Sequence, residues 1–329
     1  MSRPDRGREL AERARDGDRR SLARLLTEVE NRTSDAEAAL RMLYPLAGAA
    51  HLVGITGAPG SGKSTLTAAL VAEARKDGMA AAVLAIDPSS PITGGAILGD
   101  RVRMQAHAGD RDVFIRSMAS RGHAGGLATA TVAAAAVLDA VGFPLVFVET
   151  VGTGQSEVEV AAIADTTVVV QAPEMGDEVQ AIKAGLLEVA DIVVVNKGDR
   201  PGAQRAASQL RAMLTVGASR EAAYAGRPRP KRPEVLLATA LTGEGVPELL
   251  AAINRHGEAV RAAGPDGSAR LARAEAQLAG ILAERVRDRL HDAAHEAATR
   301  DTLEQIAAHR IDPYAAADRL LGTLGTLTR

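Results

Sequence analysis

Cysteine and tryptophan are absent from this chain of 329 residues, and aromatic residues of any kind are few. Without cysteine, disulfide bonds, thiolate metal sites and thiol nucleophiles are excluded. Three Phe and three Tyr are too few to form a stacking surface for single-stranded nucleic acid. The 39 Lys and Arg nearly balance the 41 Asp and Glu, for a net charge of −2, so no global basic field attracts nucleic acid or an anionic membrane. We therefore expect neither partner.

Long apolar runs of the kind that target or anchor a protein are also lacking. Residues 1–20 are strongly charged and carry no apolar leader. Residues 125–148 are nearly free of charge, but Asp139 and the Gly142-Phe143-Pro144 break divide them, which favours a buried helix followed by a buried strand over a membrane span. We expect a cytoplasmic protein.

The apolar spacing predicts an α/β chain in three parts. Residues 1–46 form an N-terminal helical extension, because Leu22, Leu25, Leu26 and Val29 mark one helix face. Residues 47–262 alternate short apolar runs with helical stretches, typical of a doubly wound, mostly parallel sheet. The expected strands are residues 52–56, 81–86, 145–149, 167–171, 192–196 and 234–238, and the expected crossover helices are residues 64–76, 127–140, 178–189, 203–214 and 246–261. Residues 263–329 form a C-terminal helical arm.

Two segments of the second half interrupt this pattern. The basic, Pro-rich residues 226–233 could contact nucleic acid or lipid, but a solvated loop is favoured because the run is short and has no aromatic residue. A Gly-Pro-Asp-Gly break at residues 264–267 starts the C-terminal arm. There we expect one long helical stretch over residues 268–300 and a short one over residues 312–324.

The clearest motif is the phosphate-binding signature G-x-x-x-x-G-K-[ST], which lies between an expected strand and an expected helix. Its glycines allow backbone N–H groups and the helix N-terminus to face phosphate oxygens. Lys63 would neutralise the β- and γ-phosphates, and the hydroxyl of Ser64 would bind Mg²⁺. The predicted phosphate-binding residues are Gly57, Ala58, Pro59, Gly60, Ser61, Gly62, Lys63, Ser64 and Thr65.

A second motif points to guanine. Asn196-Lys197-Gly198-Asp199 follows an apolar strand at the edge of the sheet where ligands bind in α/β proteins. The carboxylate of Asp199 can accept hydrogen bonds from N1–H and the exocyclic amine of guanine, a donor pair that adenine lacks, so it would select GTP over ATP. After the last strand, a backbone N–H of Thr239, Ala240 or Leu241 could contact guanine O6, or these residues could form a simple β-to-α turn.

Three carboxylates follow expected strands or loops at the same edge. Glu149 ends one strand and Asp87 another, and Asp100 lies in a following loop. Carboxylates gathered there are suited to bind Mg²⁺ directly or through water, although each could instead cap a helix N-terminus. Arg116 and Arg121, expected in a glycine-flanked loop, could stabilise transition-state charge as an internal arginine finger or be ordinary surface residues.

Five further segments follow one another along the chain. They are Asp87-Pro-Ser-Ser, Asp100-Arg-Val-Arg-Met, Arg116-Ser-Met-Ala-Ser-Arg-Gly122, Glu149-Thr-Val-Gly-Thr-Gly-Gln-Ser-Glu157 and Gly176-Asp177-Glu-Val-Gln180-Ala-Ile-Lys183-Ala-Gly185. In this order, the segments resemble the MeaB/ArgK family of GTPase chaperones of adenosylcobalamin-dependent methylmalonyl-CoA mutase and its relatives. The resemblance covers nearly the whole chain from about residue 21, with Gly198 and Thr239 standing where alanine and serine are more common.

The resemblance implies a P-loop GTPase domain that binds GTP or GDP with Mg²⁺ and hydrolyses GTP. It implies Lys63, Asp100, Glu149 and Lys183 as catalytic residues and the metal set Ser64, Asp87, Asp100 and Glu149. Asp177, Gln180 and Lys183 would lie in the segment that relays nucleotide state to the mutase. The resemblance further implies a partner, an adenosylcobalamin-dependent acyl-CoA mutase whose cofactor loading is gated or protected, and a homodimer formed through the C-terminal helices.

Two other functions are alternatives to a mutase-associated GTPase. An ATP-dependent kinase of a small metabolite such as arginine would need an acceptor pocket and leaves Asp199 without a purpose. A nickel-delivery GTPase would need Cys or His ligands, and the chain has no cysteine. His291 and His295, spaced like zinc ligands on a helix, are more simply a solvated helix face.

Overall fold

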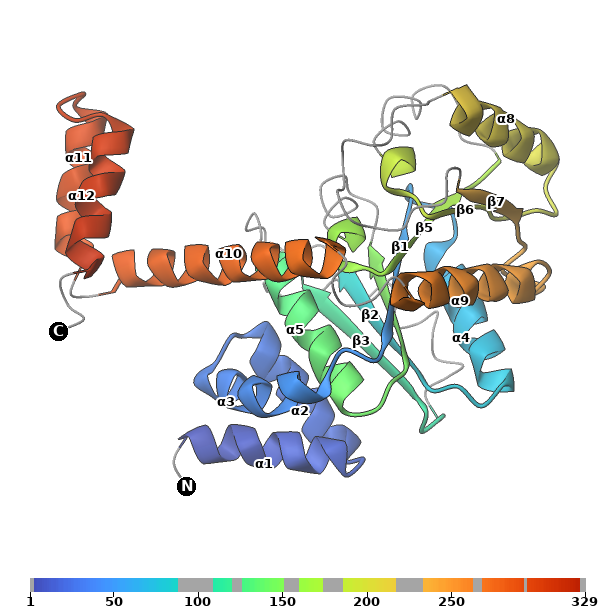
Figure 1. Ribbon diagram of the computed structural model, residues 1–329, viewed down its shortest axis with the longest axis horizontal. Helices are drawn as coiled ribbons and strands as arrows, with labels where there is room; N and C mark the ends of the chain where they lie inside the picture. Colours follow the sequence, from blue (N-terminus) through green and yellow to red (C-terminus); the bar gives the residue numbers. More distant parts are fainter. Residues whose placement is uncertain are drawn as a thin grey trace. The chain divides into compact units, whose positions relative to one another are not determined.

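The computed structural model describes residues 3–87, 109–119, 126–150, 160–173, 186–216, 233–262, 268–292 and 295–325. Its contacts divide the chain into two compact units, Met1–Arg273 and Ala274–Arg329. The first unit contains a parallel sheet of seven strands within the described residues, in the order β3-β2-β4-β1-β5-β6-β7 (Figure 1). These strands are β1 (His51–Thr56), β2 (Ala81–Asp87), β3 (Val113–Ala119), β4 (Leu145–Thr150), β5 (Thr166–Gln171), β6 (Ile192–Val195) and β7 (Glu234–Leu237).

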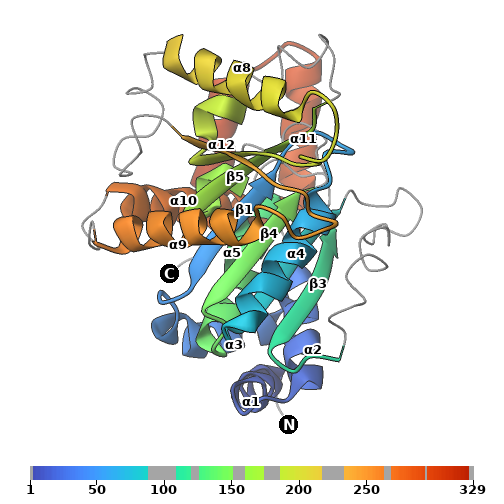
Figure 2. The same ribbon diagram turned by 90° about the vertical axis from the view of Figure 1, so that its right-hand side faces the viewer.

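Helices cover both faces of the sheet, as the continuous apolar runs predict. Helices α4 (Lys63–Lys76) and α9 (Val246–Ala262) lie on one face (Figure 2) and share a core with alternate residues of β1, β5 and β6. Helices α5 (Gly126–Ala140) and α8 (Ala203–Val216) pack against the intervening residues on the opposite face. The predicted doubly wound α/β fold is therefore confirmed. The crossover expected at residues 178–189 lies mainly outside the described residues.

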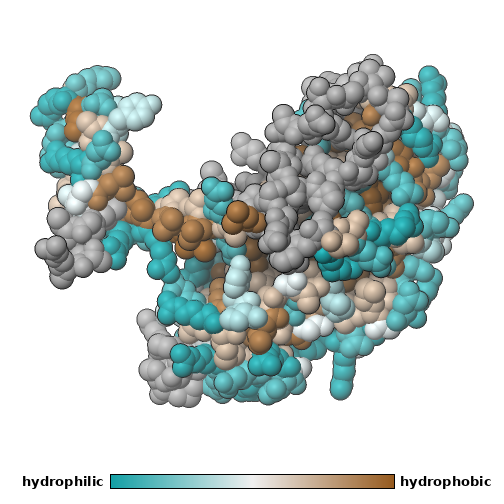
Figure 3. All heavy atoms as spheres, in the orientation of Figure 1, coloured by the Kyte–Doolittle hydropathy of each residue, from teal (hydrophilic) through white to brown (hydrophobic). Residues whose placement is uncertain are grey.

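The described residues of the C-terminal part include the helices α10 (Ser268–Leu290), α11 (Glu296–Ala307) and α12 (Pro313–Gly325). The prediction of one helical stretch over residues 268–300 is wrong, because the helix stops at Leu290. There the carboxylate of Asp292 accepts hydrogen bonds from the backbone N and the ring Nδ1 of His295, at 3.0 and 2.8 Å, a local pairing that competes with helical hydrogen bonds. Apolar side chains lie along α10 (Figure 3), and Leu271, Leu278 and Leu282 among them are exposed.

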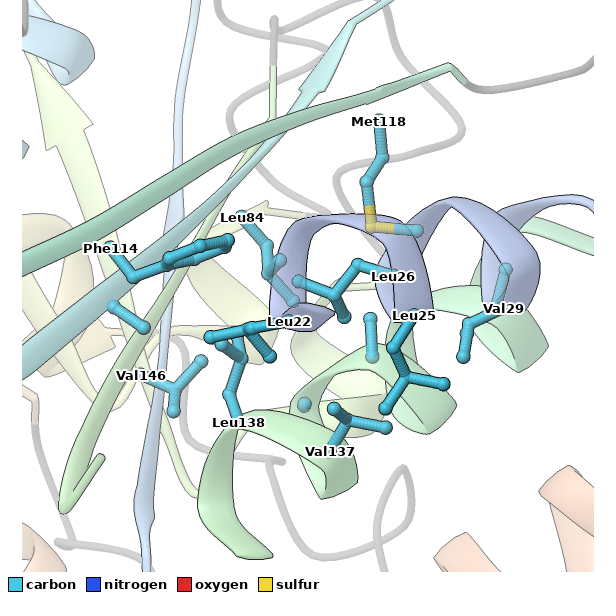
Figure 4. Packing of buried hydrophobic residues seen from close by; sticks show 14 of the residues in the cluster. Leu22, Leu25, Leu26, Val29, Leu84, Phe114, Met118, Val137, Leu138 and Val146 are labelled. Carbon is cyan, nitrogen blue, oxygen red and sulfur yellow. The ribbon is translucent and has the colours of Figure 1, made fainter. Parts of the chain in front are cut away.

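The N-terminal residues form α1 (Arg3–Arg15), α2 (Arg19–Glu30) and α3 (Ser34–Leu43), followed by the 3-10 turn Tyr44–Leu46. The predicted apolar face of α2 is confirmed: Leu22, Leu25, Leu26 and Val29 are all buried. They pack against Leu84 of β2, Phe114 and Met118 of β3, and Val137 and Leu138 of α5 (Figure 4). The N-terminal helices thus belong to the same hydrophobic core as one face of the sheet.

Strand β3 is not among the strands predicted from the sequence, and Arg116 lies in this strand. The residue was expected in a glycine-flanked loop, but it lies within β3, where its Cα pairs with that of Leu84 in β2. The run Val113-Phe114-Ile115 is the signal that could have identified the strand. Because β3 is an edge strand covered by α2, its burial depends on a partner that is distant in the sequence.

None of the helices in the described parts of the chain is both long enough and apolar enough to cross a membrane. The charge-poor segment of residues 125–148 folds, as predicted, into a helix and a buried strand: α5 ends at Ala140, and β4 begins at Leu145 with its first four residues buried.

Candidate nucleotide-binding site

The predicted phosphate-binding loop lies at the carboxyl end of the central strand β1 and leads into α4, which begins at Lys63. Two positions of this loop require glycine for two reasons: neighbouring atoms leave no room for a Cβ, and the backbone has a positive φ. Gly57 has φ of +137°, and a Cβ there would lie 2.1 Å from the carbonyl oxygen of Val170. Gly62 has φ of +89°, and a Cβ there would lie 2.4 Å from Nδ2 of Asn196. Only glycine allows the loop to fold this closely against β5 and the segment after β6.

Lys63 is buried and directed into this loop. Its Nζ donates hydrogen bonds to the carbonyl oxygens of Gly57 at 2.8 Å and Ala58 at 3.1 Å. The ammonium group is therefore held beside the backbone that the signature assigns to phosphates, where it supplies positive charge from a buried position. The hydroxyl of Ser61 is completely buried and has no hydrogen-bond partner among the described residues.

Ser64 and Glu149 form the second contact of the site. The hydroxyl of Ser64, in the first turn of α4, donates to Oε1 of Glu149 in β4 at 2.6 Å. Both side chains are buried, and Glu149 is only 2% exposed. Hydroxyl and carboxylate oxygens are the donors that Mg²⁺ prefers, so the chemistry of this pair fits a hard divalent cation. The fold brings together two residues 85 positions apart that the sequence predicted for one metal.

Asn196 connects the two predicted nucleotide motifs. Its Nδ2 donates to the carbonyl oxygen of Ser61 at 2.9 Å and to that of Gly62 at 3.3 Å. Its Oδ1 accepts a hydrogen bond from the backbone N of Ala240 at 3.1 Å. This one buried amide thus joins the phosphate loop to the turn after β7. The sequence placed Asn196 in the base motif but did not predict that it bridges these loops.

The segment predicted to select the base lies at the same sheet edge, directly after β6. Lys197 has φ of +59°, and the N–H of Gly198 donates to the carbonyl oxygen of Ala238 at 2.9 Å, which fixes this segment beside the end of β7. The side chain of Asp199 is exposed, so it is accessible to a ligand. Leu241 is 87% exposed, whereas Thr239 is buried.

The remaining predicted residues are only partly described. The backbone of Asp87 ends β2 at the same sheet edge, whereas Asp100, Arg121, Asp177, Gln180 and Lys183 lie outside the described residues. Within the described chain, no group of three or more His, Cys, Asp or Glu side chains is arranged to hold a metal.

The structure also changes two further predictions from the sequence, those for Arg116 and for the pair His291 and His295. Nη2 of Arg116 lies 2.7 Å from Oε2 of Glu30, the last residue of α2. Arg116 therefore helps to hold the N-terminal helices against β3. His291 and His295 do not share a helix, because α10 ends at Leu290, before His291, and α11 begins at Glu296, after His295.

Comparisons with known proteins agree on one family. The family model described as Methylmalonyl Co-A mutase-associated GTPase MeaB matches residues 22–296. A Pyrococcus abyssi protein named as a GTPase is 45% identical over 313 residues, which cover 95% of each chain. The fused isobutyryl-CoA mutase of Cupriavidus metallidurans is 41% identical over 194 residues, 58% of this chain and 18% of that protein. The crystal structure of an LAO/AO transport system kinase has a TM-score of 0.65 at 25% identity and covers 97% of both chains.

Proposed function

Because this chain belongs to the family of methylmalonyl-CoA mutase-associated GTPases, we propose that it is a Mg²⁺-dependent GTP hydrolase that serves as a chaperone of an acyl-CoA mutase in the cytoplasm. The bridge made by Asn196 is the observation that carries the nucleotide assignment. It joins the predicted phosphate loop to the turn after β7, so the two predicted nucleotide motifs lie next to each other at one sheet edge. In this proposal, GTP hydrolysis controls the loading or protection of adenosylcobalamin on the mutase.

The phosphates would bind in the loop of residues 57–65. Backbone N–H groups at the start of α4 would face the phosphate oxygens, and the helix dipole would favour their negative charge. Lys63 would exchange its contacts with the carbonyl oxygens of Gly57 and Ala58 for contacts with the β- and γ-phosphates. The exchange is favourable because a lysine ammonium bonds more strongly to phosphate than to neutral carbonyl oxygen.

Ser64 and Glu149 would hold Mg²⁺, together with Asp87 and Asp100 as the family resemblance implies. When bound, the ion would neutralise charge on the β- and γ-phosphate oxygens. The hydrogen bond from Ser64 to Glu149 holds both oxygen donors at one place. The chain therefore contributes a preformed part of the metal site, which reduces the reorganisation needed on binding.

Guanine would bind between the segment after β6 and the turn after β7. The exposed carboxylate of Asp199 would accept hydrogen bonds from N1–H and the exocyclic amine of the base. Asn196 and Lys197 would support this segment, and a backbone N–H of the turn formed by Thr239, Ala240 and Leu241 would contact O6. An adenine base would leave the carboxylate of Asp199 unpaired, which costs binding energy.

Hydrolysis would proceed by attack of water on the γ-phosphorus. The bond from that phosphorus to the β–γ bridging oxygen breaks, and the products are GDP and inorganic phosphate. The protein mainly positions groups and stabilises charge in such a reaction. Lys63 and Glu149 would act from the described site, and Asp100 and Lys183 are assigned as catalytic residues on the resemblance alone.

The mutase partner is supported by the relative named fused isobutyryl-CoA mutase, one part of which is 41% identical to this chain. A chain homologous to part of a fused mutase is suited to act on a separate mutase as its partner. Methylmalonyl-CoA mutase, named in the family description, and isobutyryl-CoA mutase are both candidates. Asp177, Gln180 and Lys183 would relay the nucleotide state to that partner.

We also propose that the C-terminal helices form a homodimer. Leu271, Leu278 and Leu282 on α10 are 73, 58 and 53% exposed. Their spacing of seven and four residues places them along one side of the helix. An apolar side of this kind would be buried against a second copy of the helix.

Calorimetric titration tests the nucleotide assignment. With Mg²⁺ present, the purified protein should bind GTP and not ATP. Asp199→Asn should lower the affinity for GTP and allow xanthosine triphosphate to bind, because the amide can donate to the O2 carbonyl of xanthine. An unchanged GTP affinity in this variant would show that the base assignment is wrong.

An ATP-dependent kinase of a small metabolite is the second candidate, because a solved structure similar to this chain is titled a transport system kinase. It predicts ATP binding and phosphate transfer to an acceptor instead of release as inorganic phosphate. Measuring inorganic phosphate from GTP and from ATP under the same conditions separates the two functions.

A further inference from the structure

The two ends of helix α2 bind the two ends of the edge strand β3. At the start of α2, the guanidinium group of Arg19 donates to the carbonyl oxygens of Asp110 and Arg111, both at 2.9 Å, and also to that of Val113. The same group lies 5.6 Å from the centre of the Phe114 ring. These contacts hold the amino end of β3, which is the end remote from the nucleotide site in a parallel sheet.

The other end of α2 holds the carboxyl end of β3 through Glu30. One carboxylate oxygen, Oε2, lies 2.7 Å from Nη2 of Arg116, and the other, Oε1, accepts a hydrogen bond from the backbone N of Ala119 at 3.0 Å. Arg116 also donates to the carbonyl oxygen of Ala23 at 3.1 Å. The side chains of Glu30 and Arg116 are only 13% and 16% exposed, so water screens this ion pair weakly.

The contact with Ala119 has a specific physical role. An edge strand has a neighbour on one side only, so N–H groups that point to the open side lack a strand partner. The carboxylate of Glu30 supplies the acceptor for the last residue of β3. A charged acceptor makes this hydrogen bond stronger than a neutral one, and it fixes the strand at the point where the chain leaves the sheet.

This point is connected to the proposed metal site through the sheet. Ala119 pairs with Asp87 of β2, and Ile86 next to it pairs with Thr150 of β4. Thr150 directly follows Glu149, the partner of Ser64. Glu30 therefore holds the outer end of a row of paired residues that runs along the carboxyl edge of the sheet to the nucleotide site.

We propose that Glu30 is a positioning residue for the nucleotide site. Its carboxylate fixes the end of β3 and, through the pairing of Ala119 with Asp87, the backbone from which Asp87 is presented. The N-terminal helices are then part of the support of the site. This inference rests on the proposed function, because it requires nucleotide and Mg²⁺ to bind at this edge.

Arg19 provides the matched control, since it binds the same strand at the opposite end. Glu30→Ala and Arg19→Ala should both lower the unfolding temperature. The kinetics are then compared at a temperature well below both unfolding transitions and with saturating GTP. Glu30→Ala should lower kcat about tenfold, because small displacements of positioned groups strongly reduce the rate. It should also raise the Mg²⁺ concentration needed for the half-maximal rate. Arg19→Ala should change neither quantity. Equal kinetics in the two variants would overturn the proposal.

Conservative variants separate positioning from simple stabilisation. Glu30→Gln keeps an amide oxygen for the N–H of Ala119 and should recover most of the lost kcat. If Glu30→Ala does not fold, Glu30→Asp replaces it: the side chain is one methylene shorter and should not reach Arg116 and Ala119 together, so kcat should fall several-fold. Wild-type kcat in Glu30→Asp would refute the proposal. An absence of hydrolysis in the wild type would instead refute the proposed function.

Discussion

Protonation of His51 should weaken the fold as the pH falls. His51 is the first residue of β1 and is 5% exposed. Its Nε2 lies 2.7 Å from the hydroxyl of Thr166, which lies 2.8 Å from Nδ1 of His256. Burial lowers the pKa of His51 from 6.5 to about 4; Asp165 opposes this shift, and Arg261 and His256 reinforce it. The neutral ring is therefore the form that the folded protein holds.

The direction and the size of the change in the free energy of unfolding follow from proton linkage. Above pH 6.5, His51 is neutral in both states and its contribution to stability is complete. As the pH falls towards 4, the unfolded chain binds a proton that the folded protein does not, and the free energy of unfolding decreases. A His51 pKa of 6.5 in the unfolded chain and of about 4 in the folded protein corresponds to a total loss of about 3 kcal/mol in the free energy of unfolding. About 2 kcal/mol of this free energy is already lost at pH 5.

Urea denaturation at pH 7.5 and pH 5.0 measures this loss. Circular dichroism is the suitable signal because the chain has no tryptophan. Other groups also titrate over this range, so the comparison is with His51→Gln, which cannot take up the proton. The wild type should lose about 2 kcal/mol more than the variant between the two pH values. Equal losses would refute the assignment of a low pKa to His51.

Two further substitutions test the packing and the phosphate loop. A Cβ on Gly257 would lie 2.4 to 2.7 Å from three atoms of the His51 ring, so Gly257→Ala should lower the free energy of unfolding by about 3 kcal/mol. Combining it with His51→Ala should remove most of that penalty, whereas simple additivity in denaturation would contradict this reasoning. Lys63→Ala should lower kcat for GTP about 100-fold while the urea midpoint changes little; retained turnover in a phosphate-release assay would refute the role of Lys63.

Much of the fold and the core of the site could be predicted from local sequence. The buried strands are continuous apolar runs, and the phosphate signature must lie between a strand and a helix because only that geometry directs its N–H groups to phosphates. The parallel order of the strands then brings their carboxyl ends to one edge. This is why the sequence predicts one metal site for Ser64 and Glu149, whose side chains the fold brings to 2.6 Å from each other.

The prediction of one helix over residues 268–300 failed for a reason that lies in side-chain chemistry. Its composition is rich in alanine and charged residues, which favours a continuous helix. The pairing of Asp292 with the backbone and the ring of His295 decides otherwise. Helix propensity is a weak preference, and one local hydrogen-bonded turn is sufficient to overcome it.

The sequence by itself determined which residues are predicted to carry the phosphate and base chemistry, because that prediction depends on residue type at fixed spacing within short segments. Only the tertiary structure decided that Val113–Ala119 is an edge strand, that Arg116 is bound by Glu30, and that His51 is buried beside Gly257. Each of these depends on a partner at least 32 residues away in the chain, and spacing within a segment contains no information about such a partner. Burial and edge pairing are properties of the packed sheet, so they arise only when the strands and helices are assembled.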